Sequence, residues 1–372
     1  MTQDEALSIL KTGANVFLTG EPGSGKSHTI RAYADYLKTH GVEPAITAST
    51  GIAATHINGL TIHSWSGIGI KTSLNEQDLD RIASSEYISK RVRKAKILII
   101  DEISMLSPDT LSMVEAVCRE VKQNREAFGG MQVIFVGDFF QLPPIAKKSF
   151  EEDYNQDIFS NEKQKVFAFE SNAWKRASPV ICYLSEQHRQ EDKVFLDILT
   201  AIRKNSFKET DRKVLEKRKV DANKVLDNVP KLFTHNFDVD RINDEELVKI
   251  SGDIETFTMS SMGHEALVSI LKKGCLSPER LCLKIGAAVM FTKNNQKEGY
   301  MNGTLGIVNS FSDFTHNPII KTRMGNLIEV ESADWNVEDD GKVKARISQF
   351  PLRLAWAITV HKSQGMSLDE AV

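Results

Sequence analysis

The sequence predicts an α/β protein with two parallel-sheet units and a small β-rich insert in the second unit. In the first third of the 372 residues, short β-rich runs alternate with helical stretches, as in a parallel sheet with crossover helices. Residues 96–100 and 132–136 are continuously apolar, as strands buried on both faces should be. The pattern restarts at Leu184 with a long helical stretch and a strand at 231–234, which indicates the second α/β unit.

The elements of the first unit can be placed in order. We expect a strand at residues 15–19, a helix at about 26–39 and a strand at 44–48. Apolar side chains then recur at helical spacing over residues 111–121, between the two apolar strands. The glycine pair at 129–130 ends that helix before the next strand begins.

The domain boundaries follow from these changes of pattern. We expect the first unit to span residues 1–178, with a small wedge insert at about 64–95. The second unit should combine residues 179–256 with residues 346–372. Between these two segments, residues 257–345 are richer in short β runs and in glycine and asparagine turns, so we expect a separate β-rich insert there.

The composition is that of a soluble globular protein, with 41% hydrophobic and 26% charged residues. There is no run of eighteen apolar residues, and residues 1–10 are acidic and polar where a secretory signal would be basic and then apolar, so we expect a cytoplasmic protein without a membrane span. The four cysteines form no CxxC pair and are expected to be buried thiols. The formal charge of −3 excludes a wholly basic surface but permits a basic channel.

A phosphate-binding loop is predicted between the first strand and the first long helix. The run fits the pattern G-x-x-x-x-G-K-[ST] and consists of Gly20, Glu21, Pro22, Gly23, Ser24, Gly25, Lys26 and Ser27. Glycines let the backbone N–H groups face phosphate oxygens, the Lys26 ammonium neutralises the β and γ phosphates, and the Ser27 hydroxyl ligates Mg²⁺. The alternative is a glycine turn that binds nothing. The flanking strand and helix favour an ATP site.

Two further strand ends supply the polar groups that hydrolysis needs. Asp101 and Glu102 follow a buried strand, at the edge of an open α/β sheet where ligands bind. Asp101 is predicted to hold Mg²⁺ together with Ser27, and Glu102 to polarise the attacking water. Gln141, after the strand at 132–136, either senses the γ-phosphate or is a solvent amide in a proline-terminated turn.

These residues resemble a known family, the superfamily-one helicases of the petite-integration-frequency (Pif) type, relatives of the RecD subunit. Residues 101–106, 128–130 and 137–144 are similar to its helicase motifs two and three with their intervening helix. Further matches cover nearly the whole chain and lie at residues 48–54, 61–64, 184–190 and 359–365. The resemblance implies two RecA-like domains, with an SH3-like insert in the second.

The resemblance also implies roles for single residues. Gln3 becomes the adenine-contacting glutamine, Arg189 the motif-four arginine that reaches the γ-phosphate, and Gly365 part of a turn that faces the nucleotide. A further group is expected to hold the DNA backbone or couple it to the nucleotide: Thr50, His63, His361 and Ser363.

The activity implied by the family is ATP-dependent movement from 5′ to 3′ on single-stranded DNA, opening duplexes and forks ahead of it. Its members act in DNA repair, recombination, replication and telomere maintenance, and we expect a monomer. The family's chain continues to a block with a second arginine finger, whereas this sequence ends at Val372. Because losing such a finger lowers turnover by on the order of 10³ in other P-loop enzymes, we expect a fragment or a weak motor with an incomplete second domain.

Evidence for a DNA surface is thinner than evidence for ATP. Basic residues gather at 89–96 and 201–220, where they either track phosphates or form solvated helix faces. Trp65 either stacks on a base or belongs to the core. Asn236 and Asn243 either cap helices, which is the preferred interpretation, or bind a phosphate. Two alternatives to a helicase are therefore a P-loop ATPase that remodels protein and a nucleotide-gated binder of single strands.

Overall fold

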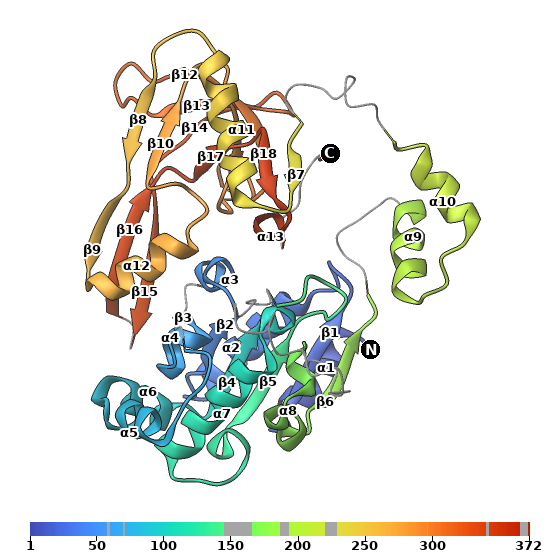
Figure 1. Cartoon of the computed structure of the whole chain (residues 1–372), viewed down its shortest axis with the longest axis vertical. Helices are drawn as coiled ribbons and strands as arrows, with labels where there is room; N and C mark the ends of the chain where they lie inside the picture. The colour runs from blue at the N-terminus through green and yellow to red at the C-terminus, as the bar shows by residue number, and fades with distance from the viewer. Residues whose placement is uncertain are drawn as a thin grey trace, which may run out of the picture. The chain divides into compact units, whose positions relative to one another are not determined.

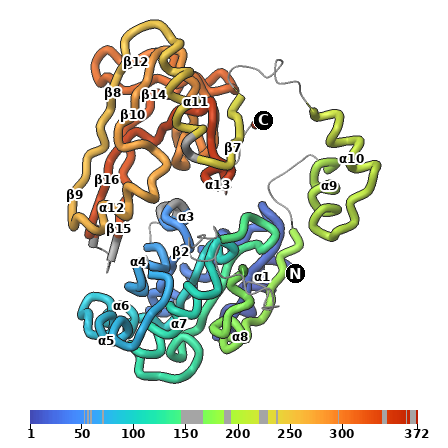
Figure 2. Tube along the Cα trace, in the orientation of Figure 1, coloured from blue at the N-terminus to red at the C-terminus, as the bar shows by residue number. Residues whose placement is uncertain are grey.

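The chain forms two compact units, Met1–Lys208 and Glu209–Val372. The computed structural model describes residues 1–57, 60–69, 71–144, 166–186, 193–219, 229–295, 297–339, 342–364 and 371–372. Figure 1 and Figure 2 follow the chain from its N-terminus through the first unit into the second.

The first unit is built on a six-stranded sheet in the order β3-β2-β4-β5-β1-β6. Every pairing in this sheet is parallel. The strands are β1 (Val16–Gly20), β2 (Ala45–Ala48), β3 (Leu60–Thr61), β4 (Ile97–Asp101), β5 (Gln132–Val136) and β6 (Val180–Leu184). The central strands are buried along their apolar runs, which explains why those runs do not alternate with polar residues.

The first unit also contains helices, several of which pack against this sheet (Figure 1). They are α1 (Gln3–Leu10), α2 (Lys26–Thr39), α3 (Gly51–His56), α4 (Ile62–Ser66), α5 (Glu76–Ser84), α6 (Glu86–Lys94), α7 (Pro108–Lys122), α8 (Asn172–Ala177) and α9 (Lys193–Arg203), with 3-10 turns at Ile103–Met105, Ala127–Gly130 and Ala168–Glu170. A capping box between Thr2 and Glu5 starts α1, and the Ser107 hydroxyl caps α7 ahead of Pro108. These two helices therefore begin where the sequence supplies a side-chain cap.

The core of the first unit joins α1 and α2 to the sheet. Leu10, Val16, Leu18 and Ile99 are fully buried in one cluster with residues of α2. On the other side, the Trp174 ring stacks on Phe135 with centroids 4.4 Å apart, so α8 packs on β5. This packing holds the strand ends that carry the candidate site.

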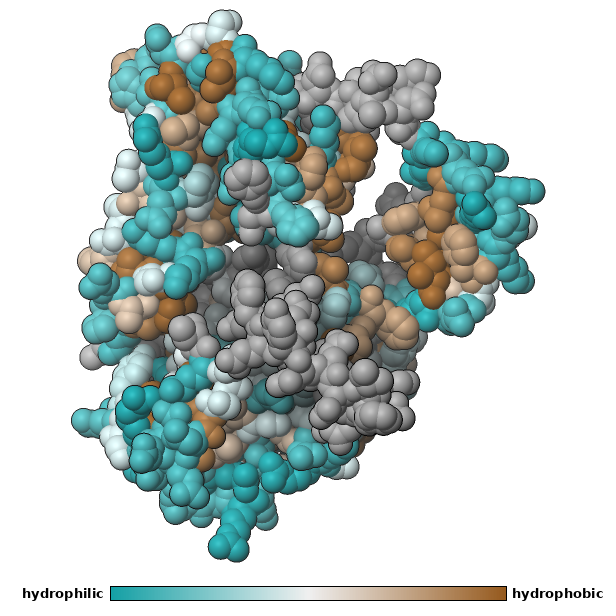
Figure 3. Space-filling view, viewed as in Figure 1, coloured by the Kyte–Doolittle hydropathy of each residue, from teal (hydrophilic) through white to brown (hydrophobic). Residues whose placement is uncertain are grey.

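The predicted boundary at residue 178 falls inside the first unit. β6 pairs in parallel with β1 along its whole length, from Val16 opposite Val180 to Gly20 opposite Leu184. Residues 180–184 therefore complete the first sheet and do not begin the second unit. The first unit then continues through α9, whose exposed side carries Val194, Leu199 and Ile202 and appears as a hydrophobic area in Figure 3.

The second unit is mainly antiparallel. Its elements are α10 (Glu209–Glu216), β7 (Lys231–Phe233), α11 (Asn236–Lys249), β8 (Glu255–Thr258), β9 (Ser260–Gly263), α12 (Glu265–Gly274), β10 (Arg280–Leu283), β11 (Ala288–Phe291), β12 (Leu305–Phe311), β13 (Pro318–Thr322), β14 (Leu327–Glu329), β15 (Ala333–Asp339), β16 (Lys342–Gln349), β17 (Leu352–Leu354), β18 (Ala357–Thr359) and α13 (Val360–Ser363). Five strands form the sheet β14-β13-β12-β11-β17, three form β15-β16-β9, and β10 pairs with β8. The main core gathers Leu283, Val289, Phe291, Ile320 and Trp356.

One parallel pair stands apart from these antiparallel sheets. β18 pairs with β7, with Ile358 opposite Leu232, so two segments far apart in sequence share a sheet. Among the residues that the structure describes, no helix has the length and apolar character needed to cross a membrane.

Candidate nucleotide-binding site

The predicted phosphate loop connects β1 to α2. Gly20 ends β1, and Gly25 is the N-cap of α2 with φ of 88° and ψ of 17°, in the left-handed region that favours glycine. No side chain caps the first turn of α2. Its free backbone N–H groups and the positive end of the helix dipole therefore remain available for an anion such as phosphate.

Gln3 lies directly against this loop. A Cβ atom on Gly25 would stand 2.1 Å from Gln3 Nε2, so only glycine fits there beside the amide. Gln3 Oε1 lies 2.8 Å from His28 Nδ1 on the first turn of α2. The amide is thus held beside the phosphate loop, and its contact with adenine stays a prediction.

Lys26 folds back over the loop. Its Nζ atom donates to the carbonyl oxygens of Gly20 at 2.8 Å and Glu21 at 3.1 Å. Burial lowers the pKa of Lys26, and the carboxylates of Asp138, Glu102 and Asp101 oppose that shift. Lys26 is therefore close to all three carboxylates and can exchange carbonyl contacts for phosphate oxygens.

Two serines complete the loop. Ser24 is 1% exposed, and its hydroxyl has no hydrogen-bond partner among the described residues, which is costly unless a ligand supplies one. Ser27 is exposed on the first turn of α2, while Glu21 is half-buried and Pro22 exposed. A hydroxyl in this position suits a hard, oxygen-preferring cation such as Mg²⁺.

The acid pair lies at the end of β4. Asp101 Oδ1 accepts the backbone N–H of Glu102 at 2.9 Å, and burial raises the pKa of Asp101 against the opposing effects of that bond and of Lys26. Glu102 adopts φ of 51°, an unusual left-handed conformation for a non-glycine residue. The Ser49 hydroxyl donates to the Glu102 carbonyl at 2.7 Å, and the Ser49 N–H donates to the Asp101 carbonyl at 3.0 Å. The segment after β2 therefore fixes the acidic turn.

A third element, the turn after β5, comes to the same edge. Asp138 is 1% exposed, and its Oδ1 accepts the Phe140 N–H at 3.1 Å. The Gln141 N–H donates to the Asp138 carbonyl at 3.0 Å, which positions the predicted phosphate sensor. The other Asp138 oxygen, Oδ2, accepts from Arg203 of α9 at 2.7 Å. Sequence reasoning missed Asp138, although its place just beyond a buried strand was a usable signal.

The sheet order explains why these groups meet. β4, β5 and β1 are neighbours in a parallel sheet, so their carboxyl ends share one edge. The phosphate loop, the acid pair and the β5 turn therefore surround one region. Ser27 and Asp101 offer oxygen ligands of the kind that Mg²⁺ takes together with substrate phosphates. The described residues contain no group of three or more His, Cys, Asp or Glu side chains placed to hold a metal ion.

The residues predicted to touch DNA are distributed over both units. The Thr50 hydroxyl accepts the Ala53 N–H at 3.2 Å and so caps α3. His63 is partly buried on α4. The Ser363 hydroxyl donates to the Val360 carbonyl at 2.9 Å in α13. The roles of these residues in DNA binding therefore stay predictions.

The base-stacking role predicted for Trp65 needs correction. Stacking requires an exposed ring face. Trp65 is only 5% exposed because α4 turns this side chain inward with Ile62. The alternative interpretation, a core residue, fits the structure. Arg189 and Gly365 lie outside the described residues, and so does the side chain of His361.

The interpretation of Asn243 is also corrected. It neither caps a helix nor faces solvent. Its amide donates to the Ala357 carbonyl at 3.0 Å and accepts the N–H groups of Trp356 at 3.1 Å and Ala357 at 3.0 Å. His235 is the N-cap of α11. Asn243 therefore ties the middle of α11 to the start of β18.

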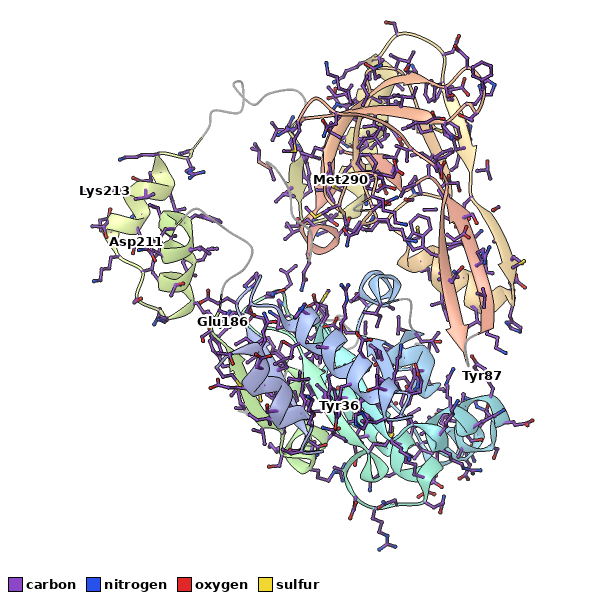
Figure 4. The ribbon with its side chains drawn as sticks, turned by 180° about the vertical axis from the view of Figure 1, so that it is seen from behind. Tyr36, Tyr87, Glu186, Asp211, Lys213 and Met290 are labelled. Carbon is purple, nitrogen blue, oxygen red and sulfur yellow. The ribbon has the colours of Figure 1, made fainter. Side chains whose placement is uncertain are left out.

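The two basic segments are partly engaged within the protein. On α6, Arg91 donates to the Ser64 carbonyl and lies 4.7 Å from the centre of the Tyr87 ring, and Arg93 donates to the Val121 carbonyl at 3.2 Å. On α10, Arg212 pairs with Glu216 at 3.2 Å. Figure 4 shows the Lys213 and Asp211 side chains on the same short helix. Acidic residues therefore offset part of the positive charge of the second basic segment.

Comparisons with known proteins agree with this geometry. The PIF1-like helicase family matches residues 4–213, and the 2B domain of the DNA helicase Pif1 matches residues 266–311. The ATP-dependent DNA helicase Pif1 of Psychrobacter sp. is 40% identical and aligns with 100% of this chain and 63% of its own length. The human ATP-dependent DNA helicase PIF1 is 35% identical over 99% of this chain and 55% of its own length. The chain thus spans between half and two thirds of these relatives.

Solved structures show the same similarity. The crystal structure of Bacteroides sp. Pif1 in complex with ADP-AlF4 matches with a TM-score of 0.83 and 31% identity, covering 99% of this chain and 84% of that one. Bacteroides Pif1 bound to single-stranded DNA matches with a TM-score of 0.61 over the same shares of the two chains, at 31% identity.

Proposed function

Because this chain belongs to the PIF1-like helicase family, we propose that it is an ATP-dependent DNA helicase that hydrolyses Mg-ATP to move along single-stranded DNA. The observation that carries the proposal is the shared sheet edge. It brings the Lys26 loop, the Asp101 and Glu102 pair and the Gln141 turn to one place. A binding protein would need the loop, but only a hydrolase needs a base and a sensor beside it.

The roles of the residues follow from their positions. The N–H groups of the loop and the Lys26 ammonium bind the triphosphate, and Gln3, beside the loop, contacts the adenine ring. Ser27 and Asp101 would hold Mg²⁺, which supplies charge neutralisation at the β and γ phosphates when bound. Glu102 orients and deprotonates water, and Gln141 responds to loss of the γ-phosphate. Arg189 adds a positive charge that stabilises the γ-phosphoryl group in the transition state.

We propose that the protein binds single-stranded DNA and fork junctions. It would move as a monomer from 5′ to 3′ along the single strand. Support comes from the family and from a solved relative bound to single-stranded DNA. Thr50, His63, His361 and Ser363 are the proposed backbone contacts. DNA repair, recombination, replication and telomere maintenance are the processes in which such an enzyme acts, and the cytoplasm is the proposed compartment.

An ATPase assay with matched variants tests the hydrolytic site. Single-stranded DNA should stimulate phosphate release by the parent chain. Lys26→Ala should lose Mg-ATP binding, whereas Glu102→Gln should keep binding and lose turnover by on the order of 10²–10⁴, the usual contribution of a general base. Lys38→Ala is the control, since Lys38 lies at the exposed far end of the same helix and pairs with Glu43 at 3.8 Å. Turnover that survives Glu102→Gln would refute the assigned base.

A strand-displacement assay tests movement and its direction. Forked duplexes with only a 5′ or only a 3′ single-stranded tail are given to the same protein with Mg-ATP. Unwinding that requires the 5′ tail supports the proposed direction, and a requirement for the 3′ tail contradicts it. DNA-stimulated hydrolysis without any unwinding favours a translocating or remodelling ATPase. ATP-dependent DNA binding without phosphate release favours a nucleotide-gated binder.

A further inference from the structure

Arg203, at the end of α9, is bound to the sheet edge that carries the candidate nucleotide site. By sequence it groups with the basic residues at 201–220, a candidate DNA-binding surface. Its side chain is 12% exposed, and its Nη1 atom lies 2.7 Å from Asp138 Oδ2. The Asp138 side chain is 1% exposed in the same pair. A charge pair removed from water to this degree is strongly coupled, since deleting one partner leaves the other charge buried and uncompensated.

Two aromatic rings hold the Arg203 guanidinium in place. Its carbon lies 4.3 Å from the centre of the Phe140 ring and 5.8 Å from the centre of the Tyr183 ring. Phe140 belongs to the β5 turn, as Asp138 does, and Tyr183 belongs to β6, so Arg203 contacts two elements besides its own helix. Arginine is suited to this position because its planar group can stack on a ring while it donates in plane to a carboxylate.

The same face of α9 reaches the phosphate loop. Thr200, three residues before Arg203, donates from its hydroxyl to Glu21 Oε1 at 3.5 Å. Residues three apart lie side by side on a helix. α9 therefore contacts the loop through Thr200 and the β5 turn through Arg203.

These contacts place a buried charge pair next to the phosphate loop. Lys26 Nζ donates to the Gly20 and Glu21 carbonyls of the loop that Thr200 contacts, and Asp138 follows β5, the neighbour of β1 in the sheet. Without Arg203, the Asp138 carboxylate would face the phosphate site uncompensated. It would draw Lys26 away from the phosphates and repel the triphosphate.

We propose that Arg203 is a positioning residue for ATP, which neutralises Asp138 and holds the β5 turn so that Lys26 is free to bind the triphosphate. Because Arg203 sits on α9, this contact also links occupancy of the phosphate site to the segment that leaves the first unit. The inference rests on the proposed ATP site, and it adds a residue that the phosphate-loop and acid-pair motifs do not contain.

The affinity for Mg-AMP-PNP, measured by calorimetry on the full chain, tests the proposal. Arg203→Met should weaken binding about tenfold, as expected when a like charge is left uncompensated beside a phosphate site. The double variant Arg203→Met with Asp138→Asn should return to within about threefold of the parent, because the offending carboxylate is gone. Arg212→Met, on an exposed pair with Glu216, is the control and should bind as the parent does.

A purely structural role gives a different result. If Arg203 only stabilised the fold, the double variant would bind no better than Arg203→Met, and that outcome would overturn the proposal. Unchanged affinity in Arg203→Met would overturn it as well. Should Arg203→Met fail to fold, as judged by circular dichroism, the comparison of Arg203→Gln, which also removes the positive charge, with and without Asp138→Asn decides by the same rescue.

Failure of the proposed function has a separate signature. If the parent binds Mg-AMP-PNP but DNA does not stimulate hydrolysis, the helicase proposal fails, while the affinity cycle still decides the role of Arg203. If hydrolysis is DNA-stimulated and the double variant shows no rescue, only the role of Arg203 fails. If the parent does not bind Mg-AMP-PNP at all, both fail.

Discussion

Gly25 offers a direct test of how the phosphate loop is built. At φ of 88°, an alanine would adopt a left-handed conformation that costs about 1–2 kcal/mol. Its Cβ would also stand 2.1 Å from Gln3 Nε2, so the Gln3 side chain would have to leave its contact with His28. Losing that exposed hydrogen bond costs about 0.5 kcal/mol more. Gly25→Ala should therefore lower the free energy of unfolding by about 2 kcal/mol.

Two comparisons separate the backbone cost from the collision. Gly41 follows α2 with φ of 72° and has no heavy atom within 4 Å of a built Cβ, so Gly41→Ala should show the backbone cost alone. In a cycle with Gln3→Ala, the two changes should be less than additive, because removal of the amide relieves the collision. Urea unfolding followed by tryptophan fluorescence measures each value, and calorimetry measures Mg-ATP affinity. Additive effects, or a Gly25→Ala chain as stable and as tight-binding as Gly41→Ala, would refute this reasoning.

Three further predictions concern charges and buried amides. Burial raises the pKa of Asp101 in the folded state above its unfolded value, so the ionised carboxylate lowers stability as the pH rises through the folded pKa. Asp101→Asn should therefore raise the urea midpoint at about pH 8 but not at about pH 4. A gain of equal size at both pH values would contradict the assignment. Arg176→Met should cost about 2 kcal/mol, because it leaves the fully buried Glu115 with Arg119 alone at 2.9 Å, and thermal unfolding reports the loss. Asn243→Ala should cost about 3 kcal/mol by orphaning backbone groups at the start of β18, seen as faster amide exchange of Ala357.

Several elements of the first unit were predictable because each left a local signal. β4 and β5 are continuous apolar runs, and α2 begins at Lys26, where the loop pattern ends. β6 carried no comparable signal. It lies at the sheet edge with Val180, Ile181 and Tyr183 exposed. Its pairing with β1 joins residues more than 160 positions apart, and no local pattern encodes such a partner.

The candidate site also contains residues that the sequence could predict and residues that it could not. Lys26, Asp101 and Glu102 were predictable because loop chemistry and strand ends are local properties. The Ser49 bonds that hold the acid pair and the Arg203 bond to Asp138 were not, since both are long-range contacts. Arg203 was assigned with its basic neighbours to a solvated or DNA-binding surface. Charge alone cannot distinguish an arginine that faces solvent from one that is paired with a buried carboxylate.

The charges at this edge also decide how ATP can bind. The carboxylates Asp101, Glu102 and Asp138 outnumber the cations Lys26 and Arg203, and Arg203 is already paired with Asp138. A free triphosphate would therefore meet a site of its own sign, and the loop N–H groups would have to overcome that repulsion. Asp101 and Ser27 would hold Mg²⁺, whose charge would offset this excess of carboxylates. ATP with excess chelator should bind at least about tenfold more weakly than Mg-ATP, and Asp101→Asn should shrink that difference. Equal affinities with and without Mg²⁺ would mean that Asp101 does not face the nucleotide.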